Sequence, residues 1–97
     1  MLHTALEEGK LVFHFQGPLD SATCQELEAE ILAKVRAAQS LVVFDLQGVE
    51  YVASTFLRLC LVISKEVGRE RFIVVNVHPM VKRVLMMADL WQFLSGT

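Results

Sequence analysis

Residues 41–57 read Leu41-Val-Val-Phe-Asp-Leu-Gln-Gly-Val-Glu-Tyr-Val-Ala-Ser-Thr-Phe-Leu57, and this stretch decides the fold. Its first part, residues 41–46, is a nearly continuous apolar run. Such a run is typical of a central strand covered on both faces, which a parallel sheet provides. After a turn and a short extended piece, residues 54–67 are predicted to form a helix that ends at Gly68. A buried strand followed by a helix indicates an α/β domain.

The chain before this stretch repeats the alternation. Residues 11–16 are predicted to form a strand that ends at the Gly17-Pro18 turn, preceded by a further strand around residues 3–7. Residues 21–38 predict an amphipathic helix, because their apolar residues recur at helical spacing. Asp20 or Ser21 is expected to cap it, since both side chains can accept a hydrogen bond from a first-turn amide.

The chain after it shows the same order. Residues 72–77 predict a third buried strand, and His78-Pro79 begins a last helix, because proline suits a first helical turn. Residues 90–94 are expected to pack back on the domain. Strands that alternate with helices predict a small α/β sandwich with a parallel or mixed sheet.

Composition limits the classes of protein. The chain has 97 residues, so residues 1–97 are expected to form one domain. Its 54% hydrophobic content excludes an intrinsically disordered protein, and is high enough that a partner is expected to cover some apolar surface.

The net charge is −2 without any basic run, so we expect no binding to nucleic acid. Without a signal peptide or an apolar run long enough for membrane insertion, we expect a cytoplasmic protein. Cys24 and Cys60 are interpreted as buried free thiols of a reducing compartment.

Signs of enzyme chemistry are weak. The five glycines are isolated, which excludes a glycine-rich phosphate loop, and His3, His14 and His78 lack metal-ligand spacing. We interpret His14 as a half-exposed strand residue and His78 as a helix cap. Asp45 is expected to accept hydrogen bonds from the turn that follows it. We therefore expect no catalytic residue, no metal and no cofactor.

The helix at residues 54–67 leaves two questions open. Its apolar residues cover almost the whole circumference, so either the helix is unusually buried or a stripe near Leu61 and Val62, beside Arg58, faces a partner protein. Ser54 and Thr55 begin this helix. Simple physics favours a pair of capping residues. The alternative is a phosphoacceptor, because a phosphate at a helix N-terminus is favoured by the free amides and by the helix dipole.

Three segments together resemble a STAS domain, the family of bacterial anti-sigma factor antagonists. They are Gly17-Pro18-Leu19-Asp20, residues 42–57, and residues 74–85, which contain His78-Pro79-Met80-Val81-Lys82-Arg83-Val84-Leu85. The resemblance covers nearly the whole chain. It implies a mixed four- or five-stranded sheet with three to four helices mainly on one face. It also implies a non-enzymatic switch that binds a serine kinase acting as an anti-sigma factor, is phosphorylated by that kinase, and is reset by a phosphatase.

The resemblance assigns roles by position. Ser54 takes the phosphoacceptor place, Thr55 that of the second motif serine and Leu57 that of the motif leucine. Three positions depart from the motif: Ala53 replaces an aspartate, whereas Phe56 and Arg58 replace glycines. The expected partner-binding surface comprises Asp20, Ser54, Thr55, Phe56, Arg58, Leu61 and Val62.

Other functions stay open at this point. The altered motif favours a constitutive STAS subunit of a larger assembly, such as a signalling complex or a lipid-transport ATPase, without phosphorylation. Some members of the family bind nucleotides or lipids, but the sequence identifies no pocket for either. The apolar surface also leaves a homodimer open.

Overall fold

The structure is a computed structural model that describes residues 2–94. Its elements, in chain order, are β1 Leu2–Glu7, β2 Lys10–Gln16, α1 Ser21–Ala38, β3 Leu41–Gly48, α2 Ser54–Val67, the 3₁₀ helix η1 Arg69–Arg71, β4 Phe72–Val75, α3 Pro79–Met87 and the 3₁₀ helix η2 Trp91–Phe93. The helices α1 and α2 have the predicted bounds. The third strand runs on to Gly48, beyond the predicted end at Leu46, and the fourth ends at Val75 instead of Val77.

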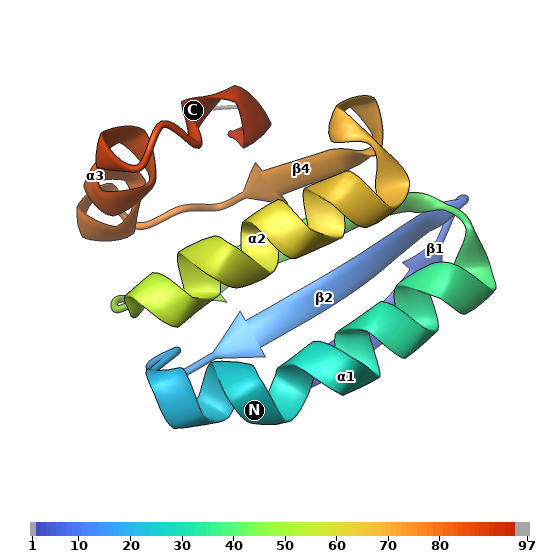
Figure 1. Cartoon of the computed structure of the whole chain (residues 1–97), viewed down its shortest axis with the longest axis horizontal. Helices are drawn as coiled ribbons and strands as arrows, with labels where there is room; N and C mark the ends of the chain where they lie inside the picture. Colours follow the sequence, from blue (N-terminus) through green and yellow to red (C-terminus); the bar gives the residue numbers. More distant parts are fainter. Residues whose placement is uncertain (1, 95–97) are drawn as a thin grey trace.

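The four strands form one sheet in the order β1-β2-β3-β4. The first two are antiparallel and are joined by a tight turn, whereas β2, β3 and β4 run parallel. The prediction of a mixed sheet is therefore confirmed (Figure 1). Because the helices connect the parallel strands, the N-termini of α1 and α2 lie at the same end of the sheet as the ends of β2 and β3.

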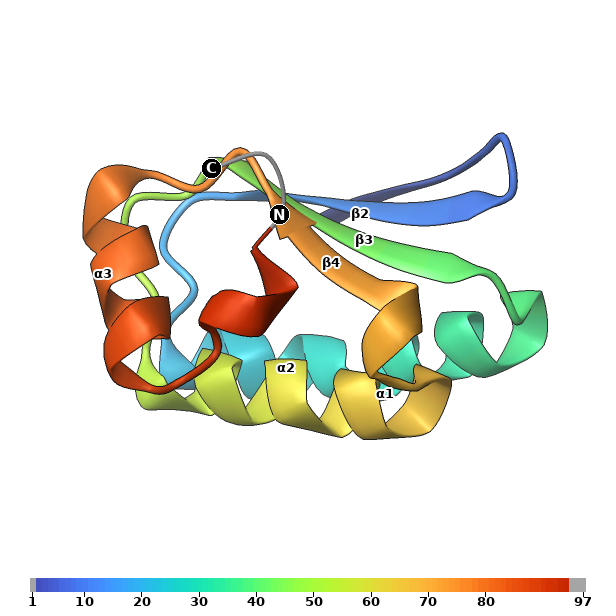
Figure 2. The ribbon, with the colours of Figure 1, turned by 90° about the horizontal axis from the view of Figure 1, so that it is seen from above.

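The helices α1 and α2 pack on one face of the sheet, and α3 lies beyond the end of the sheet toward which β4 runs (Figure 2). In β3, Val42, Phe44 and Leu46 point to that face and are fully buried. The expectation that this strand is covered on both faces is wrong, because no helix in residues 2–94 lies over the second face. Val43 is nevertheless only 6% exposed, since Val12 and Ile73 flank it on the neighbouring strands.

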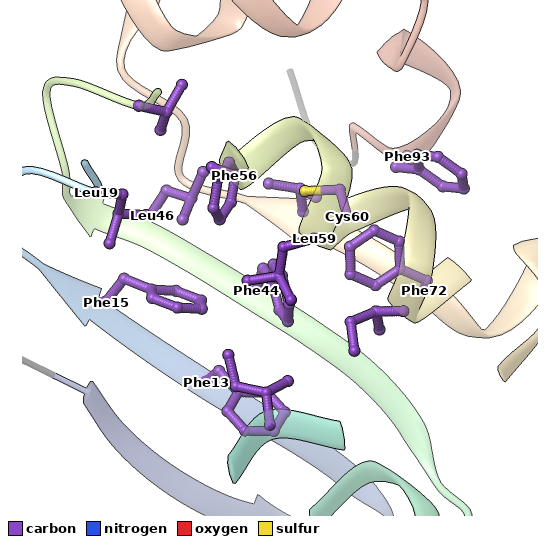
Figure 3. Close-up of a cluster of buried hydrophobic side chains, with 14 of the residues drawn as sticks. Phe13, Phe15, Leu19, Phe44, Leu46, Phe56, Leu59, Cys60, Phe72 and Phe93 are labelled. Atoms are coloured by element: carbon purple, nitrogen blue, oxygen red, sulfur yellow. The ribbon is translucent and has the colours of Figure 1, made fainter. Parts of the chain in front are cut away.

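Aromatic side chains dominate the core (Figure 3). All six phenylalanines are buried, and Phe44 lies at the centre of them. Its ring meets Phe15 and Phe72 edge to face at centroid distances of 4.9 Å, and Phe13 at 5.7 Å. Edge-to-face pairs are a favoured aromatic geometry, so the core joins three strands through specific contacts.

The end of the described chain closes the core. Phe93 is 3% exposed and its ring lies 5.1 Å from that of Phe72, and Leu94 pairs with Val74. The prediction that residues 90–94 pack back on the domain is confirmed. Cys24 and Cys60 are buried free thiols, as expected. None of the helices within residues 2–94 combines the length and the hydropathy needed to cross a membrane.

Candidate functional site

Backbone hydrogen bonds hold together the two loops that lead into α1 and α2. The Leu19 amide donates to the carbonyl of Tyr51 over 3.0 Å, and the Ala53 amide donates to the carbonyl of Leu19 over 2.9 Å. Because Asp20 follows Leu19 and Ser54 follows Ala53, this pairing brings the two residues to one end of the molecule. The structure therefore brings together the two motifs, 34 residues apart in the chain, that the resemblance selected.

Asp20 is the N-cap of α1. Its Oδ1 accepts a hydrogen bond of 2.9 Å from the amide of Thr23. That hydrogen bond holds the pKa of the Asp20 carboxyl below its ordinary value of 3.8, because it favours the charged form. The side chain is exposed, so the site carries a negative charge that a partner can reach.

The N-terminus of α2 has no side-chain cap. Ala53 occupies the cap position and Ser54 is the first helical residue. The capping interpretation of Ser54 and Thr55 is therefore wrong, because both residues lie inside the helix. The Thr55 hydroxyl is half-buried and donates to the Ser21 hydroxyl over 3.3 Å. By contrast, Ser54 is exposed, and its hydroxyl forms no hydrogen bond with any other part of residues 2–94.

One exposed stripe runs along α2 from this terminus. Its members recur at helical spacing and are Ser54, Arg58, Leu61 and Lys65. The Leu61 side chain is 45% exposed, whereas Val62, which lies beside the stripe, is half-buried. Arg58 donates to Glu28 of α1 over 3.1 Å. The helix is thus apolar on nearly every side, yet it does present one stripe to solvent.

The prediction that Phe56 belongs to the partner-binding surface is wrong. Its side chain is fully buried, and its ring lies 5.9 Å from Phe15 and 6.0 Å from Phe44 (Figure 3). The reason is helical geometry: Phe56 shares the sheet-facing side of α2 with Leu59, Cys60 and Ile63. Phe56 positions the helix and cannot touch a partner.

Sequence reasoning missed two residues beside the site. Tyr51 is 55% exposed, and together with Glu50 it borders a shallow hollow of about 230 Å³. Gly17, Pro18 and Gly48 complete the lining, so the hollow lies between the same two loops. An aromatic residue in a polar loop directly after a strand was the signal available in the sequence, since exposed aromatic side chains are common contact residues.

Other polar groups have structural partners. Asp45 accepts from the Gln47 amide over 3.0 Å, as predicted, and also from Asn76 over 3.1 Å. Its Oδ2 lies 3.1 Å from His14 Nδ1. His14 is half-exposed and His78 caps α3 through its Nδ1, so both interpretations are confirmed. In the described residues, no group of three or more His, Cys, Asp or Glu side chains is placed to hold a metal ion.

Comparisons with known proteins agree on one family. The STAS domain model matches residues 3–95. The chain is 37% identical over 59 residues to BtrV of Bordetella bronchiseptica, a candidate anti-sigma factor antagonist; the match spans 61% of this chain and about half, 51%, of that protein. An anti-sigma factor antagonist from Mycobacterium paratuberculosis has 28% identity and a TM-score of 0.87, over 100% of this chain and 86% of that one.

A third comparison concerns the fold alone. The anti-sigma factor antagonist SpoIIAA, solved in its unphosphorylated form, is 17% identical, with a TM-score of 0.86 over 98% of this chain and 86% of that one. The same Bacillus protein has also been solved in a phosphorylated form. The match to the family model over almost the whole chain, the mixed sheet with α1 and α2 on one face, and the likeness to anti-sigma factor antagonists lead to one conclusion. This chain belongs to the STAS domain family.

Proposed function

We propose that this chain is a regulatory protein-binding module that docks a serine kinase acting as an anti-sigma factor, and that phosphorylation of Ser54 ends the docking. The main support for this proposal is the Ser54 hydroxyl, which is exposed and forms no hydrogen bond within residues 2–94. It lies at the start of the α2 stripe, next to the Asp20 turn. The Thr55 hydroxyl is half-buried against Ser21, which makes Ser54 the better acceptor of the two.

The chemistry of the α2 terminus supports a switch at this position. Because Ala53 offers no side-chain cap, the amides of Ser54 and Thr55 can interact with a phosphate, whereas the Phe56 amide donates to the Ala53 carbonyl. Phosphorylation would add about −1.5 to −2 charges at one end of a stripe whose centre is the apolar Leu61. Those charges, close to the Asp20 carboxylate, would oppose a partner that packs apolar or acidic groups on the stripe.

The experiment recovers the tagged chain from its own cells, under growing and stressed conditions. Mass spectrometry then maps phosphate on its peptides and identifies the proteins that accompany it. We expect phosphate on Ser54 that varies with condition, and an accompanying serine kinase. The Ser54→Asp variant should weaken kinase binding by about tenfold or more through its added charge, whereas Ser54→Ala should bind like the parent. Equal binding by the aspartate variant would contradict a switch at Ser54.

A constitutive subunit is the second candidate, and Ala53 favours it. The missing carboxylate removes a group that could orient the acceptor or contact a kinase, while the exposed Leu61 suits a permanent apolar interface. For this candidate, the same experiment would find no phosphate under any condition and would recover the chain in a stable assembly. Ser54→Asp would then weaken the assembly only if Ser54 lies inside the interface.

A further inference from the structure

The last α-helix, α3, has two different faces. Val81 and Leu85 are 1% exposed and pack into the core. The opposite face carries Pro79, Lys82, Arg83, Met86 and Met87, which line an open hollow of about 400 Å³. The spacing of these residues is i, i+3, i+4, i+7 and i+8, so they form one continuous face over two turns. We call these five residues the methionine groove.

The methionine groove and its surroundings expose large apolar side chains to solvent. The exposed fractions are 82% for Met87 and 53% for Met86, and the adjacent Met80 is 67% exposed. Three methionines on one nine-residue helix contribute little to the core in these positions. Methionine is unbranched and polarisable, so it adapts to partners of different shape and is frequent on surfaces that bind other helices. The exposed methionines are therefore placed to be covered by a partner.

The charges of the groove are unbalanced. The helix contains no acidic residue. Lys82 and Arg83 form no ion pair anywhere in residues 2–94, whereas Lys34, Arg36 and Arg58 each pair with a glutamate. Other cations of the described chain, such as Lys10 and Lys65, are also unpaired, but only Lys82 and Arg83 border the exposed methionines. The nearest acidic residue in the sequence, Asp89, accepts instead a hydrogen bond of 3.2 Å from the indole of Trp91. Two cations thus border an exposed apolar surface, and a pair of carboxylates on a partner would complement their charge.

We propose that the methionine groove docks an acidic amphipathic helix of another protein. Apolar side chains at helical spacing on that helix would pack on Met86 and Met87, and its carboxylates would meet Lys82 and Arg83. In this arrangement the two helices would pack side by side through apolar residues spaced at i, i+3, i+4 and i+7. The proposal involves other residues than the α2 stripe and does not depend on Ser54. An anionic membrane offers a similar mixture of apolar and negative groups, but the chain carries a net charge of −2 and only two cations border the groove.

The test uses a capped synthetic helix in which leucines repeat at i, i+3, i+4 and i+7 and glutamates fill the remaining positions. A peptide of the same composition in scrambled order and one with lysine in place of glutamate serve as controls. Binding is followed by the NMR signals of methyl-labelled methionines and by the fluorescence of Trp91. This residue is the only tryptophan, lies just after α3, and is 59% exposed.

We expect saturable shifts of the Met86 and Met87 methyl signals with the acidic helix and not with either control peptide. Combining Lys82→Glu with Arg83→Glu should weaken binding about tenfold or more. The matched control combines Lys10→Glu with Arg69→Glu, which changes the net charge by the same amount at two exposed residues outside both the α2 stripe and the methionine groove. This control should bind like the parent.

Three results would overturn the proposal. One is the absence of saturation with the acidic helix, and another is equal loss of binding in the Lys82→Glu, Arg83→Glu variant and in the Lys10→Glu, Arg69→Glu control. The third is binding to vesicles of phosphatidylglycerol and phosphatidylcholine, reported by the same methionine signals, without binding to the peptide. That result would assign the groove to a lipid surface.

Discussion

Among single residues, Asp20 has a side chain whose charge stabilises the backbone at the start of α1. Its carboxylate accepts the Thr23 amide, which lowers the pKa of Asp20 in the folded protein. A carboxyl group with a lowered folded-state pKa stabilises the folded state above its unfolded-state pKa, and the contribution is lost as the pH falls through the folded-state pKa. The charge of Asp20 therefore stabilises the start of α1 at neutral pH and ceases to do so in acid.

The corresponding prediction compares Asp20→Asn with Asp20→Ala. Asparagine keeps a side-chain oxygen for the Thr23 amide and removes only the charge, whereas alanine removes the cap. We expect the parent to be the most stable at neutral pH and alanine the least. Thermal unfolding is measured from neutral pH down to roughly pH 3. The difference between the parent and the asparagine variant should shrink on acidification, and a difference independent of pH would contradict the role of the charge.

Among the elements, α2 carries both the core and the candidate interface. Phe56 and Leu61 are five positions apart and differ fully in environment, since the first is buried and the second is 45% exposed. Substitution of Phe56 is therefore expected to lower stability, and substitution of Leu61 is expected to lower binding. This separation makes α2 the element in which folding and function are tested independently.

The prediction for α2 pairs Leu61→Glu with Phe56→Ala. The exposed Leu61 should tolerate glutamate with a change in unfolding free energy within about 0.5 kcal/mol, while the variant loses its partner. Truncation of Phe56 should cost about 3–5 kcal/mol, because it opens a cavity between the helix and the sheet. Denaturant unfolding and partner binding are measured on both. Val62→Glu should lie between them in stability, as expected of a half-buried position. A large loss of stability in the Leu61 variant would show that this residue is part of the core.

For the whole molecule, the cysteines report on the packing of the helix layer against the sheet. Cys24 of α1 and Cys60 of α2 are 3% and 1% exposed. Burial raises the pKa of both thiols, most strongly that of Cys60, because the thiolate would lose its hydration. Only the thiolate is nucleophilic, so access and ionisation both protect these residues.

We therefore expect neither thiol of the folded protein to react with Ellman's reagent at neutral pH. In denaturant both thiols should be modified at once. In the native state the rate of thiol modification should be lower by about a thousandfold or more, because it depends on the small fraction of unfolded protein. Mass spectrometry of the separated peptides assigns each modification. Rapid labelling of Cys24 alone would mean that α1 opens locally, without global unfolding.

Local patterns in the sequence were sufficient for most of the elements. The alternation of apolar strands and amphipathic helices predicted α1 and α2 with their observed bounds, because caps and apolar periodicity are local signals. The same signals were sufficient for the cap at His78 and the hydrogen bond from the turn to Asp45, which involve neighbours in the chain. The resemblance to one family placed Asp20 and Ser54 in a common site.

Tertiary structure decided what is buried and what is exposed. The apolar run at residues 41–46 is compatible with a strand that helices cover on one face or on both. The structure shows helices on one face only, and on the other face Val12 and Ile73 of the neighbouring strands flank Val43. The burial of Phe56 and the exposure of Leu61 depend on how α2 is rotated against the sheet. The packing of α3 likewise decides that its methionines are exposed. Local sequence determines each element, but the contacts between elements distant in the chain determine which face of each is left for a partner.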